Sequence, residues 1–277
     1  MNNTLDQFYT NEAVALKYYN ILKQKVEINS YDIFLEPSAG QGAFYKLMPT
    51  QKREGVDLDP KYPGVEQMNF FDYTPKPNKK YIVIGNPPFG RKCSMAKKFF
   101  NYAATFADTI AFIIPRTFKR NSVQNALNMN FELIFSEDTG KDCFTPSVSA
   151  KCCFQIWQRT TNCRVPVVRK LEHPDFTFLK EEERLTADFA IVKTGGSPGK
   201  MVYSNFELLH PQTYHYIKSN TNIEKNELIE RFKGLNYTLA VDTCCQNSMG
   251  KSDLIYLYEA KYSETETENK AKELKKK

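Results

Sequence analysis

One seven-residue stretch, Ile84-Gly85-Asn86-Pro87-Pro88-Phe89-Gly90, contains the residues best suited to chemistry. Its prolines fix φ and supply no N–H donor, so the Asn86 side-chain oxygen and the Pro87 carbonyl can both accept hydrogen bonds from one amino group. Phe89 can stack on the ring that carries the amino group. Drawing the hydrogens out of the ring plane makes such a nitrogen more nucleophilic, so the stretch favours methylation of an exocyclic or amide nitrogen. A strand that runs into a proline-stiffened loop is the alternative interpretation.

Two segments upstream have the pattern of a nucleotide-type cofactor site. Residues 34–44 predict a buried strand, a turn and the start of a helix, and Gly40 and Gly42 let the turn approach a ligand closely. Residues 55–60 predict a second strand, and Asp57 at its end is placed to bind the two hydroxyls of a ribose.

Strand and helix patterns alternate through the first part of the chain. Apolar runs predict strands at residues 31–35, 55–58, 65–70, 81–85, 109–114, 131–135 and 152–157. Helix patterns follow Asn11 and Ser94. Such alternation predicts a mainly parallel sheet with helices on both faces. Because ligands bind at the carboxyl ends of parallel strands, the cofactor and the acceptor should meet at that edge.

Five elements in this order resemble a known family. The segment Gln7-Phe8-Tyr9-Thr10-Asn11, the glycine turn, the acidic strand, the segment around Asn69 and the Asn-Pro-Pro-Phe stretch resemble the S-adenosylmethionine-dependent adenine-N6 methyltransferases with motifs in the gamma order. The resemblance covers roughly residues 5 to 159. Asn11 stands where the family usually has Pro, and Asn69 where it more often has Asp. Either residue at 69 can accept from the adenine amino group.

The resemblance implies the fold, the cofactor and the site. The fold would be the Rossmann-like class I methyltransferase fold, with seven strands of which the last two form an antiparallel pair, and the cofactor would be S-adenosyl-L-methionine. The residues implied to bind the cofactor are Phe8, Tyr9, Thr10, Glu36, Gly40, Gly42, Asp57, Leu58, Asn69 and Phe70. Those implied to hold the acceptor are Asn86, Pro87, Pro88 and Phe89. The methyl group would pass directly to a target adenine flipped from a duplex or taken from a single strand.

Local charge favours a nucleic-acid substrate. Seven bases and one acid, Asp108, lie between residues 90 and 120; the bases are Arg91, Lys92, Lys97, Lys98, Arg116, Lys119 and Arg120. They would surround the methyl-transfer site with cations for a phosphate backbone. A solvated basic helix face is the alternative. DNA is the favoured substrate and RNA the alternative; a glutamine methyltransferase and a non-catalytic nucleic-acid binder are less favoured.

Composition predicts an intracellular protein without a membrane span or a metal. The chain of 277 residues has a net charge of +6, no run of 18 apolar residues and no hydrophobic N-terminal segment. Its seven cysteines never form a Cys-x-x-Cys pair, so free thiols in a reducing compartment are favoured over metal ligands. The oligomeric state stays open.

The chain is expected to have three parts. Residues 1–160 would form the catalytic domain, and residues 161–261 a smaller α+β region for target recognition or an accessory role. Within that region a hairpin is predicted, and its Gly195-Gly196-Ser197-Pro198-Gly199-Lys200 turn could contact a phosphate backbone or be an ordinary turn. Residues 262–277 alternate Glu, Thr and Lys without an apolar period and are expected to be disordered.

Overall fold

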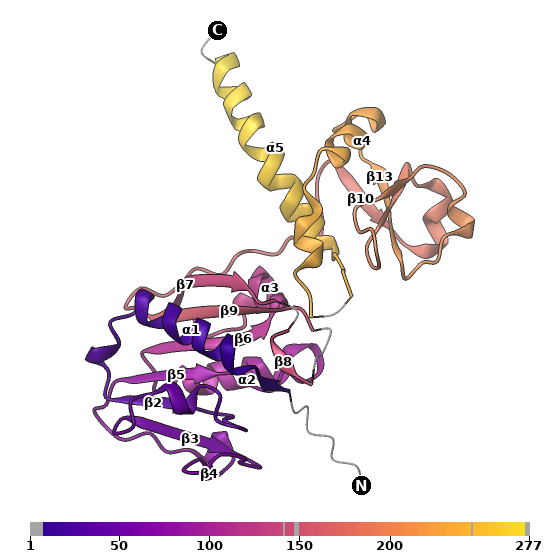
Figure 1. Cartoon of the computed structure of the whole chain (residues 1–277). Helices are drawn as coiled ribbons and strands as arrows, with labels where there is room; N and C mark the ends of the chain where they lie inside the picture. The colour runs from indigo at the N-terminus through magenta and orange to yellow at the C-terminus, as the bar shows by residue number, and fades with distance from the viewer. Residues whose placement is uncertain (1–7, 141, 147–149, 245, 275–277) are drawn as a thin grey trace. The chain divides into compact units, whose positions relative to one another are not determined.

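The computed structural model describes residues 8–140, 142–146, 150–244 and 246–274, with side chains up to Tyr262 in the last helix. The chain divides into two compact units, Met1–Val167 and Val168–Lys277, each described here by itself (Figure 1). This division lies close to the boundary expected at residues 160 and 161.

A seven-stranded sheet forms the centre of the first unit. Its strands are β2 (Ile33–Glu36), β3 (Arg53–Asp57), β4 (Glu66–Gln67), β5 (Tyr81–Gly85), β6 (Thr109–Pro115), β7 (Phe131–Asp138) and β9 (Cys152–Arg159). They lie in the order β4-β3-β2-β5-β6-β9-β7. The first five are parallel, whereas β9 is antiparallel to both β6 and β7. The expected Rossmann-like class I arrangement, with its antiparallel pair, is confirmed.

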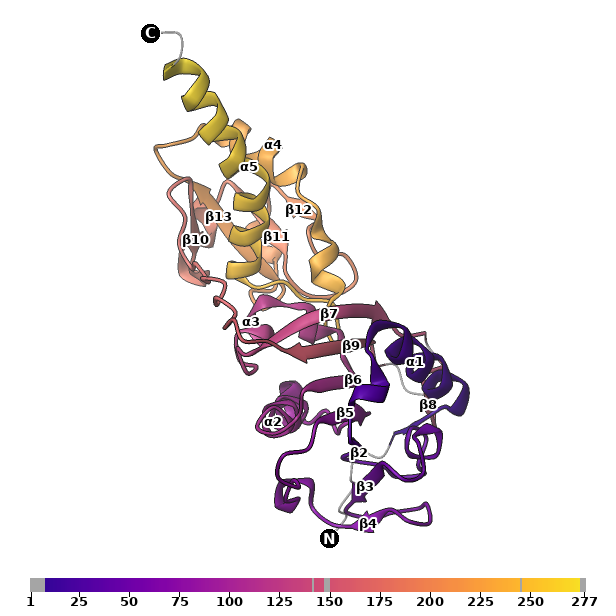
Figure 2. The same cartoon turned by 90° about the vertical axis from the view of Figure 1, so that its left-hand side faces the viewer.

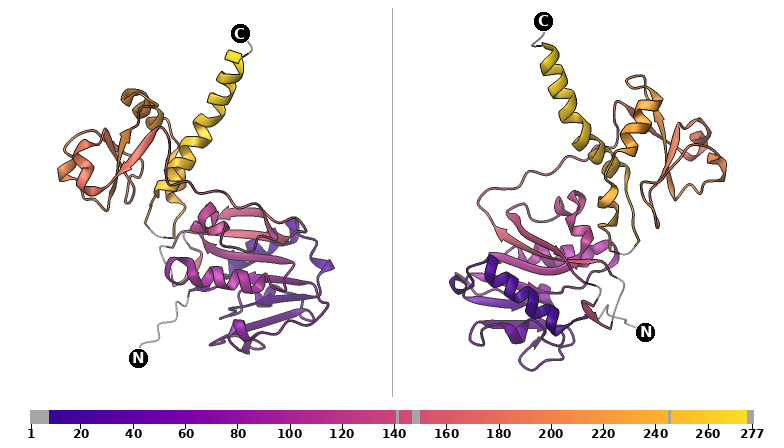
Figure 3. Two further views of the ribbon diagram at one scale, coloured as in Figure 1. Left: turned by 180° about the vertical axis from the view of Figure 1, so that it is seen from behind. Right: turned by 45° about the horizontal axis from the view of Figure 1, so that its top comes forward.

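Helices cover both faces of this sheet. The helices of the unit are α1 (Glu12–Lys25), α2 (Ser94–Ala103) and α3 (Asn121–Gln124), with 3-10 turns η1 (Ile28–Ser30), η2 (Tyr45–Leu47), η3 (Phe70–Asp72), η4 (Arg91–Cys93) and η5 (Arg116–Lys119). Figure 2 shows α1 and α2 on opposite sides of the strands, and from behind α2 lies in front of the sheet (Figure 3). Tyr18 of α1 stacks on Phe154 at 4.4 Å, and Phe100 of α2 packs edge-on to Trp157 at 5.4 Å. Every residue of β5 and β6 is therefore buried, as expected for central strands covered on both sides.

The segment expected as a strand at residues 65–70 is largely irregular. Only Glu66 and Gln67 pair, as β4, and the 3-10 turn η3 begins at Phe70. The Asn69 side-chain oxygen accepts a hydrogen bond from the Phe71 N–H at 3.2 Å. This side-chain cap favours a turn over a longer strand.

A small two-stranded sheet, which the sequence did not predict, joins distant parts of the first unit. Strand β1 (Tyr9–Thr10) pairs antiparallel with β8 (Phe144–Thr145). The Asn11 N–H also donates to the Cys143 carbonyl at 3.0 Å, and the Asn11 side chain caps α1 by accepting from the Ala13 N–H. The start of the chain is thereby tied to the connection between β7 and β9.

The second unit is the expected smaller α+β region. Its elements are β10 (Phe176–Leu179), η6 (Glu181–Thr186), β11 (Phe189–Val192), β12 (Met201–Val202), η7 (Phe206–Leu208), β13 (Tyr214–Ser219), α4 (Lys225–Lys233), η8 (Tyr237–Val241) and α5 (Lys251–Leu274). The four strands are antiparallel in the order β10-β13-β11-β12, which confirms the predicted hairpin of β11 and β12. Phe176, Ile217, Phe232, Leu254 and Tyr258 belong to the core between the sheet and the two helices.

Helix α5 continues beyond the point where disorder is expected. It runs to Leu274, so residues 262–274 are helical, and residues 275–277 lie outside the described residues. The buried side chains of Leu254, Ile255 and Tyr258 fix its first turns. Glu, Lys and Ala then extend an existing helix without the cost of a new nucleus. None of the helices in the described part of the chain has the length and apolar character needed to span a bilayer.

We expect Phe100→Ala to destabilise the first unit by roughly 3 to 5 kcal/mol, because Phe100 is fully buried against Phe131 and Trp157. Trp157 is the single tryptophan of the chain, so its fluorescence during urea unfolding reports on this unit. Leu16→Ala on the exposed face of α1 is the control, and its unfolding midpoint should barely move. Equal shifts for the two variants would contradict the packing.

Candidate active site

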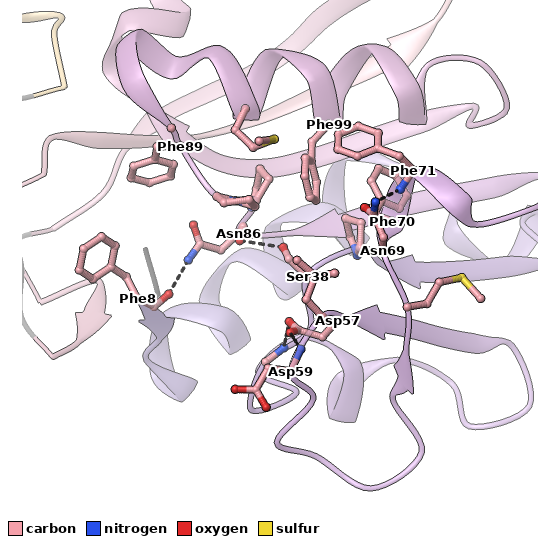
Figure 4. Close-up of a pocket in the computed structure, with 18 of the residues that line it drawn as sticks. Phe8, Ser38, Asp57, Asp59, Asn69, Phe70, Phe71, Asn86, Phe89 and Phe99 are labelled. Atoms are coloured by element: carbon pink, nitrogen blue, oxygen red, sulfur yellow. Dashed lines mark hydrogen bonds between the residues drawn. The ribbon is translucent and has the colours of Figure 1, made fainter. Parts of the chain in front are cut away.

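A cavity of about 550 Å³ opens at the carboxyl ends of the strands of the first unit (Figure 4). Its lining consists of Phe8, Tyr9, Pro37, Ser38, Gly40, Asp57, Leu58, Asp59, Met68, Asn69, Phe70, Phe71, Asn86, Pro87, Pro88, Phe89, Gly90, Met95 and Phe99. All four predicted acceptor residues and seven of the ten predicted cofactor residues therefore meet in one cavity. Its volume is within the range of ligand sites, roughly 300 to 1,000 Å³.

The Asn86 side-chain amide makes a hydrogen bond through its nitrogen, whereas its oxygen has no hydrogen-bond partner among the described residues. Its Nδ2 donates to the Phe8 carbonyl at 2.9 Å, and the Ser38 hydroxyl donates to the Asn86 backbone carbonyl at 3.0 Å. The Asn86 Oδ1 atom is buried and has no hydrogen-bond partner among the described residues. A buried acceptor left unsatisfied costs about 1 to 3 kcal/mol, which a ligand that donates a hydrogen bond would recover. Figure 4 shows this oxygen on the side of Phe89.

Aromatic rings stand beside the amide. Phe89 is half-buried and packs edge-on to Phe144 at 6.1 Å, and Phe8 contacts the same ring at 6.4 Å. Phe144 is buried and comes from β8. Sequence reasoning missed it, because no motif marks β8 and only its pairing with β1 brings Phe144 here.

The loop after Phe89 needs a glycine. Gly90 has φ of +66°, and a Cβ there would lie 2.8 Å from the Met95 Cβ atom. The chain can therefore turn tightly into α2, which brings Met95 and Phe99 to the cavity wall. Neither residue belongs to a motif that the sequence analysis assigned to the site.

At the other end of the cavity, Asp57 organises the glycine turn. Its Oδ2 accepts from the Gly40 N–H at 2.7 Å and its Oδ1 from the Asp59 N–H at 2.8 Å. Each carboxylate oxygen has a second lone pair, so Asp57 can still accept from a ligand hydroxyl. Gly40 has φ of +47°, and a Cβ there would lie 3.0 Å from the Tyr9 ring, which shows how closely Tyr9 covers the turn.

The two ends are joined by the segment around η3. Leu58 is 54% exposed and available to a flat ring, whereas Phe70 is 2% exposed and packs against Phe99 at 5.0 Å. The Asn69 side-chain oxygen already accepts one hydrogen bond, from the Phe71 N–H. Phe71, the second phenylalanine of the pair, also lines the cavity and was not predicted.

Three predicted cofactor residues, Thr10, Glu36 and Gly42, are not among the lining residues. Thr10 pairs with β8, and Gly42, with φ of +72°, lies where a Cβ would be 2.7 Å from the Tyr62 ring. Glu36 is buried, and its Oε2 accepts from the Tyr45 N–H at 2.6 Å. Gly42 thus belongs to the turn itself, Glu36 holds the segment that follows the turn, and Thr10 belongs to the β1–β8 pairing.

Burial raises the pKa of Glu36 well above its ordinary value, although hydrogen bonds from the Tyr45 and Phe44 N–H groups oppose the shift. The folded protein thus holds the proton of this carboxyl to higher pH than the unfolded chain does. The unfolding free energy of the first unit should therefore fall as pH rises from about 4.3, the unfolded-state pKa of Glu, towards the raised value. Glu36→Gln removes this component, so its urea-unfolding profile, followed by Trp157 fluorescence, should depend less on pH over that window. Parallel profiles for the two proteins would contradict it.

Only some of the seven bases between residues 90 and 120 are available to contact a phosphate backbone. Arg116 and Lys119 both pair with Asp138, at 3.2 and 3.3 Å, and Arg120 is buried. Arg91 and Lys92 remain exposed. They lie in η4, directly after the acceptor loop, and Lys98 is exposed on α2. Among the described residues, no group of three or more His, Cys, Asp or Glu side chains could hold a metal ion.

No family model and no curated protein matches the chain. Solved structures do. The 23S rRNA methyltransferase ErmE is 14% identical with a TM-score of 0.39, covering 57% of this chain and 71% of its own. A protein of a type I restriction-modification system is 15% identical with a TM-score of 0.42, covering 55% and 42%. The N-methyltransferase NodS from Bradyrhizobium japonicum is 10% identical with a TM-score of 0.39, covering 52% and 95%. Similarities this distant carry no argument about cofactor or substrate.

Proposed function

We propose that this protein transfers a methyl group from S-adenosyl-L-methionine to the exocyclic N6 amino group of adenine in a nucleic acid, with DNA the favoured substrate. The observation that carries the proposal is the Asn86 Oδ1 atom, a buried acceptor that has no hydrogen-bond partner in the described part of the chain. Asn86 lines the cavity together with Pro87 and Phe89. Such an acceptor calls for a hydrogen-bond donor, and an exocyclic amino group can supply one.

The cavity residues fit the cofactor. Asp57 would accept the ribose hydroxyls, Leu58 would cover one face of the adenine, and Asn69 would accept at its edge. Tyr9, against the glycine turn, would close over the methionine end. When bound, S-adenosyl-L-methionine supplies an electrophilic methyl group on a cationic sulfur.

The chain's own part in the reaction is to hold and orient the acceptor. Asn86 Oδ1 and the Pro87 carbonyl would take the two amino hydrogens, which draws them from the ring plane and exposes the nitrogen lone pair. Phe89 would stack on the base. Positioning of this kind provides much of the rate enhancement in a direct transfer, and the target base has to leave its stack to enter the cavity.

Charge distribution favours RNA as a second candidate substrate. The first unit has 21 Lys and Arg against 15 Asp and Glu, whereas the second has 17 of each. The positive surplus lies on the catalytic unit, and the second unit adds none of the net charge common in DNA-recognition modules. A structured RNA would be read by shape rather than through the major groove.

Tritiated-methyl transfer onto plasmid DNA, total RNA and a protein extract, run in parallel, tests the proposal. Label in DNA is the expected result. Label confined to RNA would replace DNA by the second candidate, and label confined to protein would favour the glutamine alternative. Absence of label in all three would contradict methyl transfer.

A further inference from the structure

Asn86 is held by a backbone group from a distant part of the chain. The Phe8 carbonyl, which accepts from Asn86 Nδ2 at 2.9 Å, lies directly before β1. Strand β1 is fixed in turn by its pairing with β8 and by the hydrogen bond from the Asn11 N–H to the Cys143 carbonyl. The Phe8 carbonyl is therefore a fixed acceptor and not a flexible side chain.

A fixed acceptor determines which way the amide points. A side-chain amide has one end that donates and one that accepts, and only the donating end can face a carbonyl. With Nδ2 turned to Phe8, Oδ1 points to the side of Phe89 (Figure 4), and it has no hydrogen-bond partner among the described residues. A carboxylate at this position would have no donor, so one of its oxygens would lie against the Phe8 carbonyl oxygen, an unfavourable contact.

We propose that the Phe8 carbonyl is a positioning group that orients Asn86 and requires an amide, not a carboxylate, at this position. The inference rests on the proposed function and adds to it a specific role for the N-terminal strand. Because Tyr9 of the same strand covers the glycine turn, one short strand would position both the acceptor and the methyl donor.

The variant Asn86→Asp separates this role from simple hydrogen-bond acceptance. If Asn86 acts only as an acceptor, an ionised carboxyl is at least as good, and activity of the variant should hold or rise with pH. If the Phe8 carbonyl requires a donor, only the protonated carboxyl can donate to it while offering its other oxygen to the amino group. Activity of the variant should then fall by about 10-fold per pH unit above the pKa of the introduced carboxyl.

The pH effects of neighbouring titratable groups cancel when the variant is compared with the natural protein. Asp57 and Asp59 line the cavity, Glu36 packs against Gly85, and Tyr9 lies on β1. All four are present in both proteins, so the ratio of variant to natural activity at each pH isolates the introduced carboxyl. Ser38→Ala, which removes the hydrogen bond to the Asn86 backbone but keeps the amide, is the control, and its ratio should not depend on pH.

A second measurement does not need activity. In Asn86→Asp protein, whose folding is checked by Trp157 fluorescence, the carboxyl of residue 86 is titrated by carbon-13 NMR. We expect a pKa above the ordinary 3.9 of Asp, because the Phe8 carbonyl favours the protonated form. An ordinary or lowered pKa, or an activity ratio that rises with pH, would overturn the proposal. Failure of the natural protein to transfer methyl groups would instead contradict the proposed function, while the titration would still decide the role of Phe8.

Discussion

Asn86→Ala is expected to reduce methyl transfer by about 100-fold or more while leaving cofactor binding nearly unchanged. The substitution removes the Oδ1 acceptor, so the amino nitrogen keeps its lone pair delocalised into the ring. It also removes the donor to the Phe8 carbonyl, which loosens the contact with β1. The measurement is single-turnover transfer of labelled methyl, with cofactor affinity measured by calorimetry on the same preparations.

Asn29→Ala is the matched control for this substitution. Asn29 is exposed in η1 of the same unit, so its substitution makes the same chemical change at a position away from the cavity. Its activity should match that of the natural protein. Turnover of Asn86→Ala within a factor of a few of the control would show that Asn86 does not act on the acceptor.

Asp57→Ala is expected to weaken S-adenosyl-L-methionine binding by at least about 10-fold, or roughly 1.4 kcal/mol. Each charge-assisted hydrogen bond to a ribose hydroxyl contributes about 1.5 to 3 kcal/mol at most. The carboxylate also anchors the Gly40 and Asp59 N–H groups, so the turn that approaches the cofactor loses two internal hydrogen bonds.

Asp57→Asn should have an intermediate effect on cofactor affinity. Its amide oxygen can keep one of the backbone contacts, but it has no charge and only one acceptor atom. Its calorimetric affinity should lie between those of the natural protein and Asp57→Ala. Equal cofactor affinity in all three proteins would remove Asp57 from the binding site.

The parts of the fold that sequence predicted well are those where one physical factor dominates. Residues 81–85 form β5 with the expected bounds because an apolar run buried on both faces has few alternatives. Asn86 and Asp57 lie at the cavity because Asp57 ends β3, Asn86 directly follows β5, and parallel strands bring their carboxyl ends to one edge.

Errors arose where a local side chain or a distant partner decides the structure. The Asn69 cap shortens the strand expected at residues 65–70. Glu36, at the end of its strand, accepts from the backbone behind the glycine turn instead of facing the cavity. The contact between Asn86 and Phe8 uses a backbone carbonyl 78 positions away, and residue types do not show such a contact.

The most direct test of the central claim identifies the product. Nucleic acid methylated by the protein with labelled cofactor is digested to nucleosides, which are separated and identified by mass spectrometry. The proposed function predicts that the label is found in the N6-methylated adenine nucleoside, and the acceptor role of Asn86 predicts that Asn86→Ala removes it. Label in another nucleoside, such as one with a ring-methylated cytosine, would contradict methyl transfer to an adenine amino group.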